Sequence, residues 1–292
     1  MYPFSREELK KLYLPRKDSH KGQNGKLLVI GGSRLFHAAS LWSLKIASRI
    51  VDMVFYSSIP ENNAIVQRCK EEFRDGIIVP RDKIDSYIKE ADCVLIGPGL
   101  PRLEGQEEGD DDTKKLTETL LKKYPGKKWI IDGGSLQVMD PRIIPRNAIL
   151  TPHRKEFKIL FENELRIKNQ KSGIRNKNHH SKFLIHDSVV LEIARKYKCV
   201  ILLKGQNDIV CSSTEGCAGV NGGNAGMTKG GTGDVLSGLV AALYCKNGAF
   251  LSALAGSFFN KMAGDSLFKR VGYYFNASDL ADEIPKIMAS FL

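Results

Sequence analysis

The sequence contains no uninterrupted apolar run of the roughly 18 to 20 residues that a membrane-spanning helix requires, so we expect no association with a membrane. Its first eleven residues carry charges of both signs and no apolar segment, which argues against a secretory signal and favours a cytoplasmic protein. No helix-turn-helix motif, zinc-finger spacing or interleaving of aromatic and basic residues is present. Nucleic acid is therefore not an expected partner. The chain also shows no internal repeat.

Cysteine is sparse, and its spacing carries no motif. The six cysteines include no Cys-x-x-Cys pair, and Cys93, Cys199 and Cys211 lie in apolar, strand-like runs. Such placement is typical of small buried thiols. We therefore expect reduced cysteines rather than disulfides or a zinc site.

Positive charge is concentrated in one segment. The formal net charge is +11, and residues 163–182 supply nearly half of the excess with six basic residues against one acid. Their polar composition, which includes His179 and His180, predicts a solvated insertion without a metal site. An opposite run, residues 104–112, carries six acids. This distribution argues against a nucleic-acid surface, and the overall positive field favours a small polyanionic substrate. The six basic residues are Arg166, Lys168, Lys171, Arg175, Lys177 and Lys182.

Apolar, strand-like runs alternate along the chain with helical patterns. This alternation predicts an α/β fold with a mainly parallel central sheet and helices on both faces, in a single domain spanning residues 1–292. In such sheets ligands bind at the carboxyl ends of the strands, so motifs there are candidates for chemistry. We expect strands at residues 26–32, 53–58, 76–80, 93–99, 129–134, 148–153 and 199–205, a hairpin at 208–213 and 215–220, and helices near 38–50, 83–91, 113–124, 155–161, 188–198, 234–245, 249–269 and 279–291.

A glycine-rich loop precedes an apolar helix at residues 224–234, which read Asn-Ala-Gly-Met-Thr-Lys-Gly-Gly-Thr-Gly-Asp. The first N–H groups of a helix lack intrahelical partners and the helix dipole adds positive charge, so such a terminus binds anions. Gly230, Gly231 and Gly233 let phosphate approach the backbone. Asp234 is placed to take a proton from a hydroxyl during phosphoryl transfer. The simpler alternative is a flexible loop in which Asp234 caps the helix.

Other polar motifs follow the expected strands. They are Gly31-Gly32-Ser33, Gly97-Pro98-Gly99-Leu100, Thr151-Pro152-His153 with Glu156, and Lys204-Gly205-Gln206-Asn207-Asp208. Taken alone, the glycines predict tight turns, and Glu156 predicts a carboxylate in the first turn of a helix. Asn207 and Asp208 are equally typical of a plain hairpin turn.

Seven segments, in order, resemble the ribokinase-like NAD(P)H-hydrate dehydratases, a family that repairs hydrated nicotinamide cofactors. The resemblance runs from about Ser19 to the C-terminus and implies a ribokinase-like fold. The segments are residues 20–22, 31–33, 97–100, 151–153 with Glu156, 204–205, 224–234 and 277–280.

The resemblance implies a role for individual residues, with Asp234 as the catalytic base. The implied anion hole comprises Asn224, Gly230, Gly231, Thr232 and Gly233. The implied nucleotide-binding residues are Lys204, Gly205, Gln206, Asn207, Asp208 and Gly233. The implied substrate-binding residues are Ala38, Gly99, His153 and Asp234. Glu156 matches the acid that organises Mg²⁺ through water, a role that suits a hard carboxylate oxygen.

The sequence departs from the family pattern at three positions. Gly134 replaces the second acid of an Asp-Ala-Asp-Ala-Leu pattern in which Asp132 is retained. His37 replaces the glycine of a Gly-Ala pair, and Pro101 stands where a further glycine is usual. Since Asp234 and its loop are retained, we interpret Gly134 as variation within the family and not as loss of activity. Together, the three departures keep open the alternative of a regulator without catalysis.

The resemblance implies a hydro-lyase that converts hydrated NADH or NADPH to NADH or NADPH with Mg²⁺ and a phosphoryl donor. ADP is expected rather than ATP, because residues 224–234 resemble the loop of the ADP-using members; AMP and phosphate would be released. A separate NAD(P)H-hydrate epimerase is an expected partner, and we expect a homo-oligomer. Two alternatives stay open: a ribokinase-like kinase of a small vitamin precursor or sugar alcohol, and a nucleotide-binding regulator without catalysis.

Overall fold

The computed structural model describes residues 1–69, 75–171 and 185–291. Within these residues, ten strands form one sheet in the spatial order β1-β10-β9-β8-β7-β6-β5-β2-β3-β4. Neighbouring strands are parallel except β8 with β9 and β9 with β10. The mainly parallel sheet and the hairpin are thus confirmed. The strands are β1 (Tyr2–Pro3), β2 (Lys26–Ile30), β3 (Met53–Ser57), β4 (Ile77–Ile78), β5 (Cys93–Ile96), β6 (Lys128–Ile131), β7 (Ile149–Leu150), β8 (Val200–Leu203), β9 (Asp208–Ser212) and β10 (Gly216–Val220).

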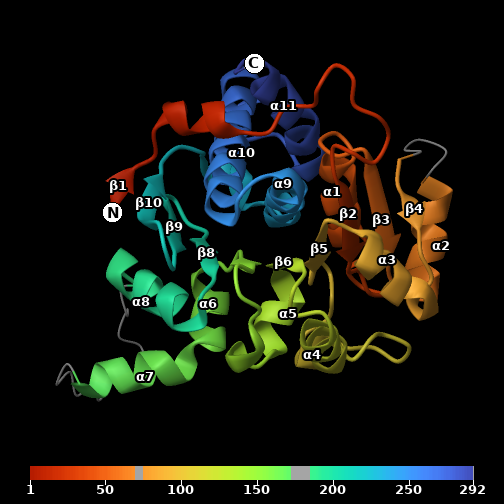
Figure 1. The fold of residues 1–292 in the computed structure, drawn as a ribbon, viewed down its shortest axis with the longest axis horizontal. Coiled ribbons are helices and arrows are strands. Elements are labelled where there is room, and N and C mark those ends of the chain that lie inside the picture. Colours follow the sequence, from red (N-terminus) through yellow and green to blue (C-terminus); the bar gives the residue numbers. More distant parts are fainter. Residues whose placement is uncertain (70–74, 172–184, 292) are drawn as a thin grey trace.

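Helices cover both faces of the sheet, as predicted. In Figure 1, α9, α10 and α11 lie above the sheet and α5, α6 and α8 lie below it. Helix α1 packs beside α9, and the long α10 crosses β8, β9 and β10. The helices are α1 (His37–Ala47), α2 (Pro60–Arg68), α3 (Ile84–Glu90), α4 (Thr113–Lys123), α5 (Gly133–Val138), α6 (Arg154–Leu160), α7 (Glu162–Lys171), α8 (Asp187–Tyr197), α9 (Thr232–Lys246), α10 (Ala249–Val271) and α11 (Ala277–Ala289).

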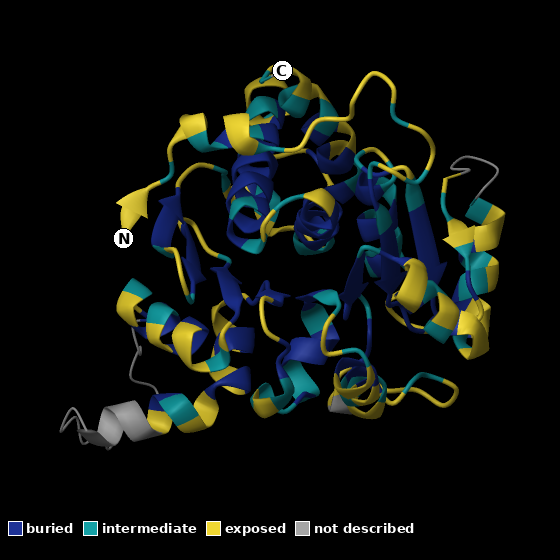
Figure 2. Ribbon diagram, viewed as in Figure 1, coloured by how far each residue is buried: buried dark blue, intermediate teal, exposed yellow. Residues whose placement is uncertain are grey.

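The sheet separates two hydrophobic cores. Successive side chains of a strand point to opposite faces, so Leu27 and Val29 join the core beneath α9 and α10. Leu28 and Ile30 join the core beneath the helices of the other face. All four are fully buried, and Figure 2 shows the central strands as buried throughout. This two-sided burial explains why the strands read as continuous apolar runs instead of alternating patterns.

Several predicted strands end earlier in the structure, and part of one predicted loop is helical. The expected strand at 129–134 ends at Ile131, and the next turn of chain forms α5, which begins at Gly133. The insertion was predicted as a solvated loop from residue 163, but its first part is helical, since α7 spans Glu162–Lys171. The rest of the insertion, including His179 and His180, lies outside the described residues.

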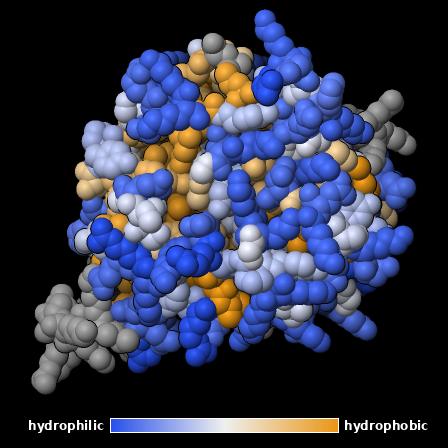
Figure 3. Space-filling model, viewed as in Figure 1, coloured by the Kyte–Doolittle hydropathy of each residue, from blue (hydrophilic) through white to orange (hydrophobic). Residues whose placement is uncertain are grey.

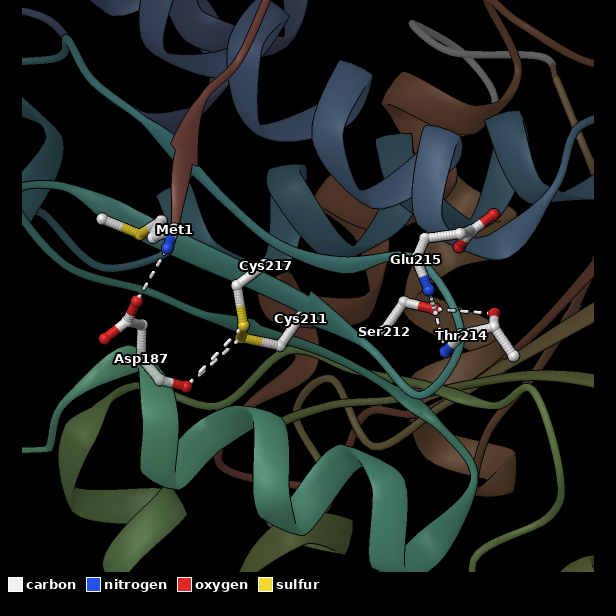
Figure 4. Close-up of a disulfide and its surroundings, with 7 residues drawn as sticks. All are labelled: Met1, Asp187, Cys211, Ser212, Thr214, Glu215 and Cys217. Atoms are coloured by element: carbon white, nitrogen blue, oxygen red, sulfur yellow. Dashed lines mark hydrogen bonds and ion pairs between the residues drawn. A yellow bond between two sulfur atoms is a disulfide. The ribbon is translucent and has the colours of Figure 1, made fainter.

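The prediction that all cysteines are reduced is wrong for one pair. Cys211 on β9 and Cys217 on β10 form a disulfide, shown in Figure 4. The register of the hairpin places them directly opposite each other on adjacent strands, which is why their side chains can meet. Cys93 and Cys199 are free and buried, as predicted.

Among the described residues, no helix has the length and hydropathy needed to cross a bilayer. The face shown in Figure 3 is mainly hydrophilic, with hydrophobic side chains in small separate areas.

Candidate active site

The glycine-rich loop ends where helix α9 begins, at Thr232. Its N-cap is Gly231, which supplies no side-chain cap, and a terminus of this kind can bind an anion through N–H groups that lack intrahelical partners. The Thr232 N–H already donates to the Lys229 carbonyl oxygen at 3.4 Å. Gly231 has φ +94°, and a Cβ atom there would overlap the Trp42 ring and lie 2.8 Å from Ala277 Cβ. Glycine is therefore required at this position. Asp234 lies in the first turn of α9, not at the cap that the simpler alternative assigned to it.

Asp234 is a buried carboxylate whose pKa is raised toward neutrality. Burial, followed by the negative charge of Asp132, raises the pKa of Asp234 to about 7, while the positive charge of Lys204 lowers it. A carboxylate with a pKa near neutrality is well matched to proton abstraction at neutral pH. Its backbone is anchored because Ser43 Oγ of α1 donates to the Asp234 carbonyl oxygen at 2.7 Å.

A buried ion pair lies beside Asp234. Lys204 Nζ, at the end of β8, donates to Asp132 Oδ1 at 2.9 Å. Burial opposes the charge on Lys204, but Asp132 and Glu156 outweigh it, and the pKa of Lys204 is raised. Burial also raises the pKa of Glu156. Three carboxylates therefore interact with one ammonium group, an arrangement that would be further stabilised by an added cation.

His153 and Glu156 form the start of α6 by a reciprocal capping interaction. The backbone N–H of His153 donates to Glu156 Oε2 at 2.8 Å, and His153 Nδ1 accepts from the backbone N–H groups of Lys155 and Glu156, both at 3.1 Å. Glu156 Oε1 accepts from Gln137 Nε2 at 3.3 Å. The structural alternative for Glu156, a first-turn helix carboxylate, is thus confirmed. Within the described ranges, no cluster of three or more His, Cys, Asp or Glu residues could hold a metal.

A cavity of about 640 Å³ lies at the N-terminus of α9, within the size range of small-molecule sites. It brings together eight of the predicted residues: His153, Lys204, Gly205, Gln206, Asp208, Asn224, Thr232 and Gly233. The cavity lining does not include Asn207, Gly230, Gly231, Asp234, Glu156, Ala38 or Gly99.

Two predicted anion-hole side chains are already used within the protein. Asn224 Oδ1 accepts from the Gly226 N–H at 3.0 Å, and its Nδ2 donates to the Gly264 carbonyl oxygen at 2.9 Å. Thr232 Oγ1 donates to the Met227 carbonyl oxygen at 2.7 Å. These side chains fix the shape of the loop. The N–H groups of Gly226, Met227 and Thr232 are also bonded within it, so the donors that a phosphate could use are the other backbone N–H groups of the loop.

Ala38 and Gly99 belong to a second group of predicted residues at the ends of β2 and β5. A Cβ atom on Gly99, which has φ +70°, would lie 3.1 Å from both Ala39 Cβ and Gly32 Cα, so the two loops are in close contact. Ala38 is in the first turn of α1, the helix whose Ser43 holds the Asp234 backbone. Helix α1 thus connects this group to the cavity side of the site.

The model of the NAD(P)H-hydrate dehydratase family matches residues 27–286. The chain belongs to this family. A bifunctional NAD(P)H-hydrate repair enzyme of Methanocaldococcus jannaschii is 35% identical over 97% of this chain and 52% of its own length. An ADP-dependent (S)-NAD(P)H-hydrate dehydratase of Cenarchaeum symbiosum is 30% identical over 94% of this chain and 92% of its own length. The chain spans about half the length of the bifunctional relatives it matches.

A solved structure of the ADP/ATP-dependent NAD(P)H-hydrate dehydratase from Bacillus subtilis, co-crystallised with ATP and Mg²⁺, has the same fold. The TM-score is 0.76 at 22% identity, covering 100% of this chain and 99% of that one. The ribokinase-like fold is thereby confirmed.

One departure from the family pattern has a physical explanation. A Cβ atom on Gly134 would overlap the backbone carbonyl oxygen of Leu100, so an aspartate does not fit at this position in the observed packing. His37 is exposed at the start of α1 and Pro101 is buried. The structure gives no account of what these two substitutions change.

The lining residues that the sequence did not predict include Asn260 and Lys261 of α10, each only 5% exposed. The sequence does contain a signal for them, because they interrupt an otherwise small and apolar helix, residues 249–264, with adjacent polar groups. Buried polar residues in such a helix require partners, and Lys261 donates to the loops of the site, whereas Asn260 Oδ1 has no hydrogen-bond partner among the described residues.

Proposed function

We propose that the protein catalyses the ADP-dependent dehydration of hydrated NADH and NADPH, yielding NADH or NADPH, AMP and phosphate. The observation that carries the proposal is Asp234, a carboxylate with a pKa of about 7 in the first turn of a helix whose N-terminus has no side-chain cap. Membership of the dehydratase family and the ADP dependence named for the C. symbiosum relative support it.

In the first step, Asp234 removes the proton from the hydroxyl group of the hydrated nicotinamide ring. The hydroxyl oxygen forms a bond to the terminal phosphorus of ADP while the bond to the AMP leaving group breaks. The N–H groups of Gly230, Gly231 and Gly233 stabilise the charge on the transferred phosphoryl oxygens. Asn224 and Thr232 act indirectly, by holding the loop.

In the second step, phosphate leaves with the electrons of its bond to ring carbon. The lone pair of the ring nitrogen assists this departure, and the released phosphate takes a proton from the adjacent ring carbon, which restores the double bond of the dihydronicotinamide. Ala38, Gly99 and His153 are the proposed contacts to this substrate. Exclusion of water from the closed site would prevent hydrolysis of the donor.

The nucleotide is assigned to the loop at the end of β8. Lys204, Gly205, Gln206 and Asp208 line the cavity, and Lys204 supplies positive charge for phosphate. Asn207 is exposed in the same turn and is included as a backbone contact only.

We propose that Mg²⁺ is held beside Glu156, whose carboxylate would act through water while phosphate oxygens of the nucleotide supply direct ligands. Mg²⁺ keeps most of its waters and needs only one or two carboxylates besides phosphate oxygens, which agrees with Glu156 acting through water. When bound, the ion would neutralise phosphate charge.

Two partners complete the proposal. The bifunctional relatives suggest that a separate NAD(P)H-hydrate epimerase acts with this chain.

We further propose that the chain, as one domain over residues 1–292, forms a cytoplasmic homo-oligomer. Sedimentation equilibrium would measure its mass, and a monomeric mass at all concentrations would contradict the homo-oligomer.

The test is to incubate hydrated NADH with the protein, Mg²⁺ and either ADP or ATP, and to follow absorbance of the dihydronicotinamide. We expect recovery with ADP, and AMP and phosphate as products. Equal or faster recovery with ATP would contradict the ADP assignment. A stable phosphorylated product would support the kinase alternative, and nucleotide binding without turnover of any acceptor would support the regulator.

A further inference from the structure

Helix α10 presents one polar face to the two loops that form the nucleotide cavity. Ser257, Lys261, Gly264 and Asp265 are spaced at i, i+4, i+7 and i+8, which places them along one side of the helix. Ser257 Oγ donates to Asp208 Oδ2 at 2.7 Å. At the other end of this face, Asp265 Oδ2 accepts from the Gly223 N–H at 3.0 Å.

Lys261 is the residue that touches both loops. Its Nζ donates to the carbonyl oxygens of Gly205 at 3.1 Å and Gln206 at 3.0 Å, in the loop between β8 and β9. It also donates to the Gly222 carbonyl oxygen at 3.1 Å, in the segment that follows β10. An ammonium group has three N–H donors, so this set uses its full capacity. Asp208 Oδ1, at 3.4 Å, supplies the opposing charge.

We infer that Lys261 is a positioning residue for the nucleotide, acting as a tethered cation that joins the 205–208 and 222–224 loops before the nucleotide binds. This inference rests on the proposed assignment of the cavity to an adenine nucleotide. The side chain of Lys261 is 6% exposed and its donors are all occupied, so it acts through the loops and not by direct contact with phosphate. A site whose walls are already fixed loses less conformational entropy on binding.

The removal of this ammonium group would leave three carbonyl oxygens and one carboxylate oxygen facing one another. These four oxygens form a cation-binding set, and without a cation their mutual repulsion would separate the loops. The Lys261→Ala variant would leave space for a small cation in their midst. The variant should therefore bind nucleotide poorly, and its nucleotide affinity should recover when a hydrogen-bonding cation is added.

The experiment measures ADP affinity by titration calorimetry, with kcat and KM for both substrates, in the wild-type protein and in Lys261→Ala. We expect the Kd and KM for ADP to rise by about ten- to a hundredfold, as for loss of a charged hydrogen-bonding group. We expect kcat at saturating ADP and KM for hydrated NADH to change by less than about threefold, since chemistry at Asp234 does not use Lys261.

Ammonium or methylammonium chloride should restore ADP affinity to Lys261→Ala, whereas tetramethylammonium chloride at equal ionic strength should not, because it lacks N–H donors. Unchanged ADP affinity in a folded Lys261→Ala would overturn the inference. A loss of ADP affinity that all of these salts reverse, or that none of them reverses, would overturn it as well. If Lys261→Ala does not fold, Lys261→Met in the presence of ADP gives the second test. If ADP raised the melting temperature of Lys261→Met as much as that of the wild type, the inference would be contradicted. Failure of the wild-type protein to bind ADP would contradict the proposed function instead.

Discussion

Lys204 Nζ lies 2.9 Å from Asp132 Oδ1, and this ion pair joins the carboxyl end of β8 to the turn that follows β6. Asp132 is 2% exposed, so its charge has no compensation from water. The same ammonium group lowers the pKa of Asp234, whereas the Asp132 carboxylate raises it. The pair therefore sets the charge at the proposed base while offering positive charge to the nucleotide.

Replacement of Lys204 should weaken nucleotide binding more than binding of the hydrated cofactor. Lys204→Ala removes the cation from the cavity wall and leaves Asp132 buried without its partner, a loss that typically costs about 3–5 kcal/mol of stability. ADP and hydrated NADH titrations measure the two affinities, and melting curves record the stability. Lys155→Ala is a matched control, because Lys155 is an exposed lysine of the nearby α6. Unchanged ADP affinity in Lys204→Ala would remove this residue from the site.

The pH dependence of turnover should show an acidic limb with a midpoint near pH 7. Asp234 must be ionised to accept a proton, so kcat/KM should rise as the pH increases through its pKa of about 7. Asp132→Asn removes the neighbouring negative charge that raises this pKa, and it frees Lys204 to stabilise ionised Asp234. Both changes lower the pKa of Asp234, so the acidic limb of the pH profile should move to lower pH. A limb that stays in place or moves to higher pH would contradict this account of the cluster.

Two adjacent glycines of the loop should respond differently to alanine. A Cβ atom on Gly231 would overlap Trp42 and would require a left-handed backbone, whereas a Cβ atom on Gly230 would have no neighbour within 4 Å. We expect Gly231→Ala to destabilise the protein by at least about 1–3 kcal/mol and to weaken ADP binding. Gly230→Ala retains the backbone N–H and should stay close to the wild type in both measurements. Equal melting temperatures for the two variants would show that the loop tolerates the side chain.

The sequence was sufficient for the elements whose signal is local. The strands that contain Leu28 and Val94 are buried on both faces and read as apolar runs, and the loop before α9 is recognisable because glycine and Asp234 stand at fixed offsets from an apolar helix. The end of β6 was misplaced because the apolar run Trp129–Ile131 continues into glycines, which fit either a strand end or the tight start of a helix.

Contacts between distant segments could not be obtained in this way. Lys261 is 39 residues from Gly222 and 55 from Gln206, so nothing local connects them. The pairing of Cys211 with Cys217 likewise depends on the register of the hairpin, which cysteine spacing alone does not specify. Asn224 and Thr232 likewise bond to backbone carbonyl oxygens of the protein because folding places those oxygens beside them.

The proposed base gives the most direct prediction. Asp234→Asn retains the size of the side chain but cannot accept a proton, and general-base catalysis typically contributes about 100- to 10,000-fold, so turnover should fall by at least about two orders of magnitude. ADP should bind as well or more tightly, because the amide does not repel phosphate. Initial rates with hydrated NADH and titrations with ADP measure the two effects.

The stability of Asp234→Asn has a sign that follows from the raised pKa. A carboxyl group whose pKa is about 7 in the folded protein and near 3.8 when unfolded binds its proton more tightly in the folded state. The free energy of unfolding of the wild type therefore declines as the pH rises from about 4 to 7, and above pH 7 the ionised carboxylate imposes its full cost. Asp234→Asn does not titrate, so its melting temperature at pH 8 should equal or exceed that of the wild type. Turnover gives the decisive outcome for the proposed base. If Asp234→Asn retained more than about a tenth of wild-type turnover, proton abstraction at Asp234 would not be the catalytic step.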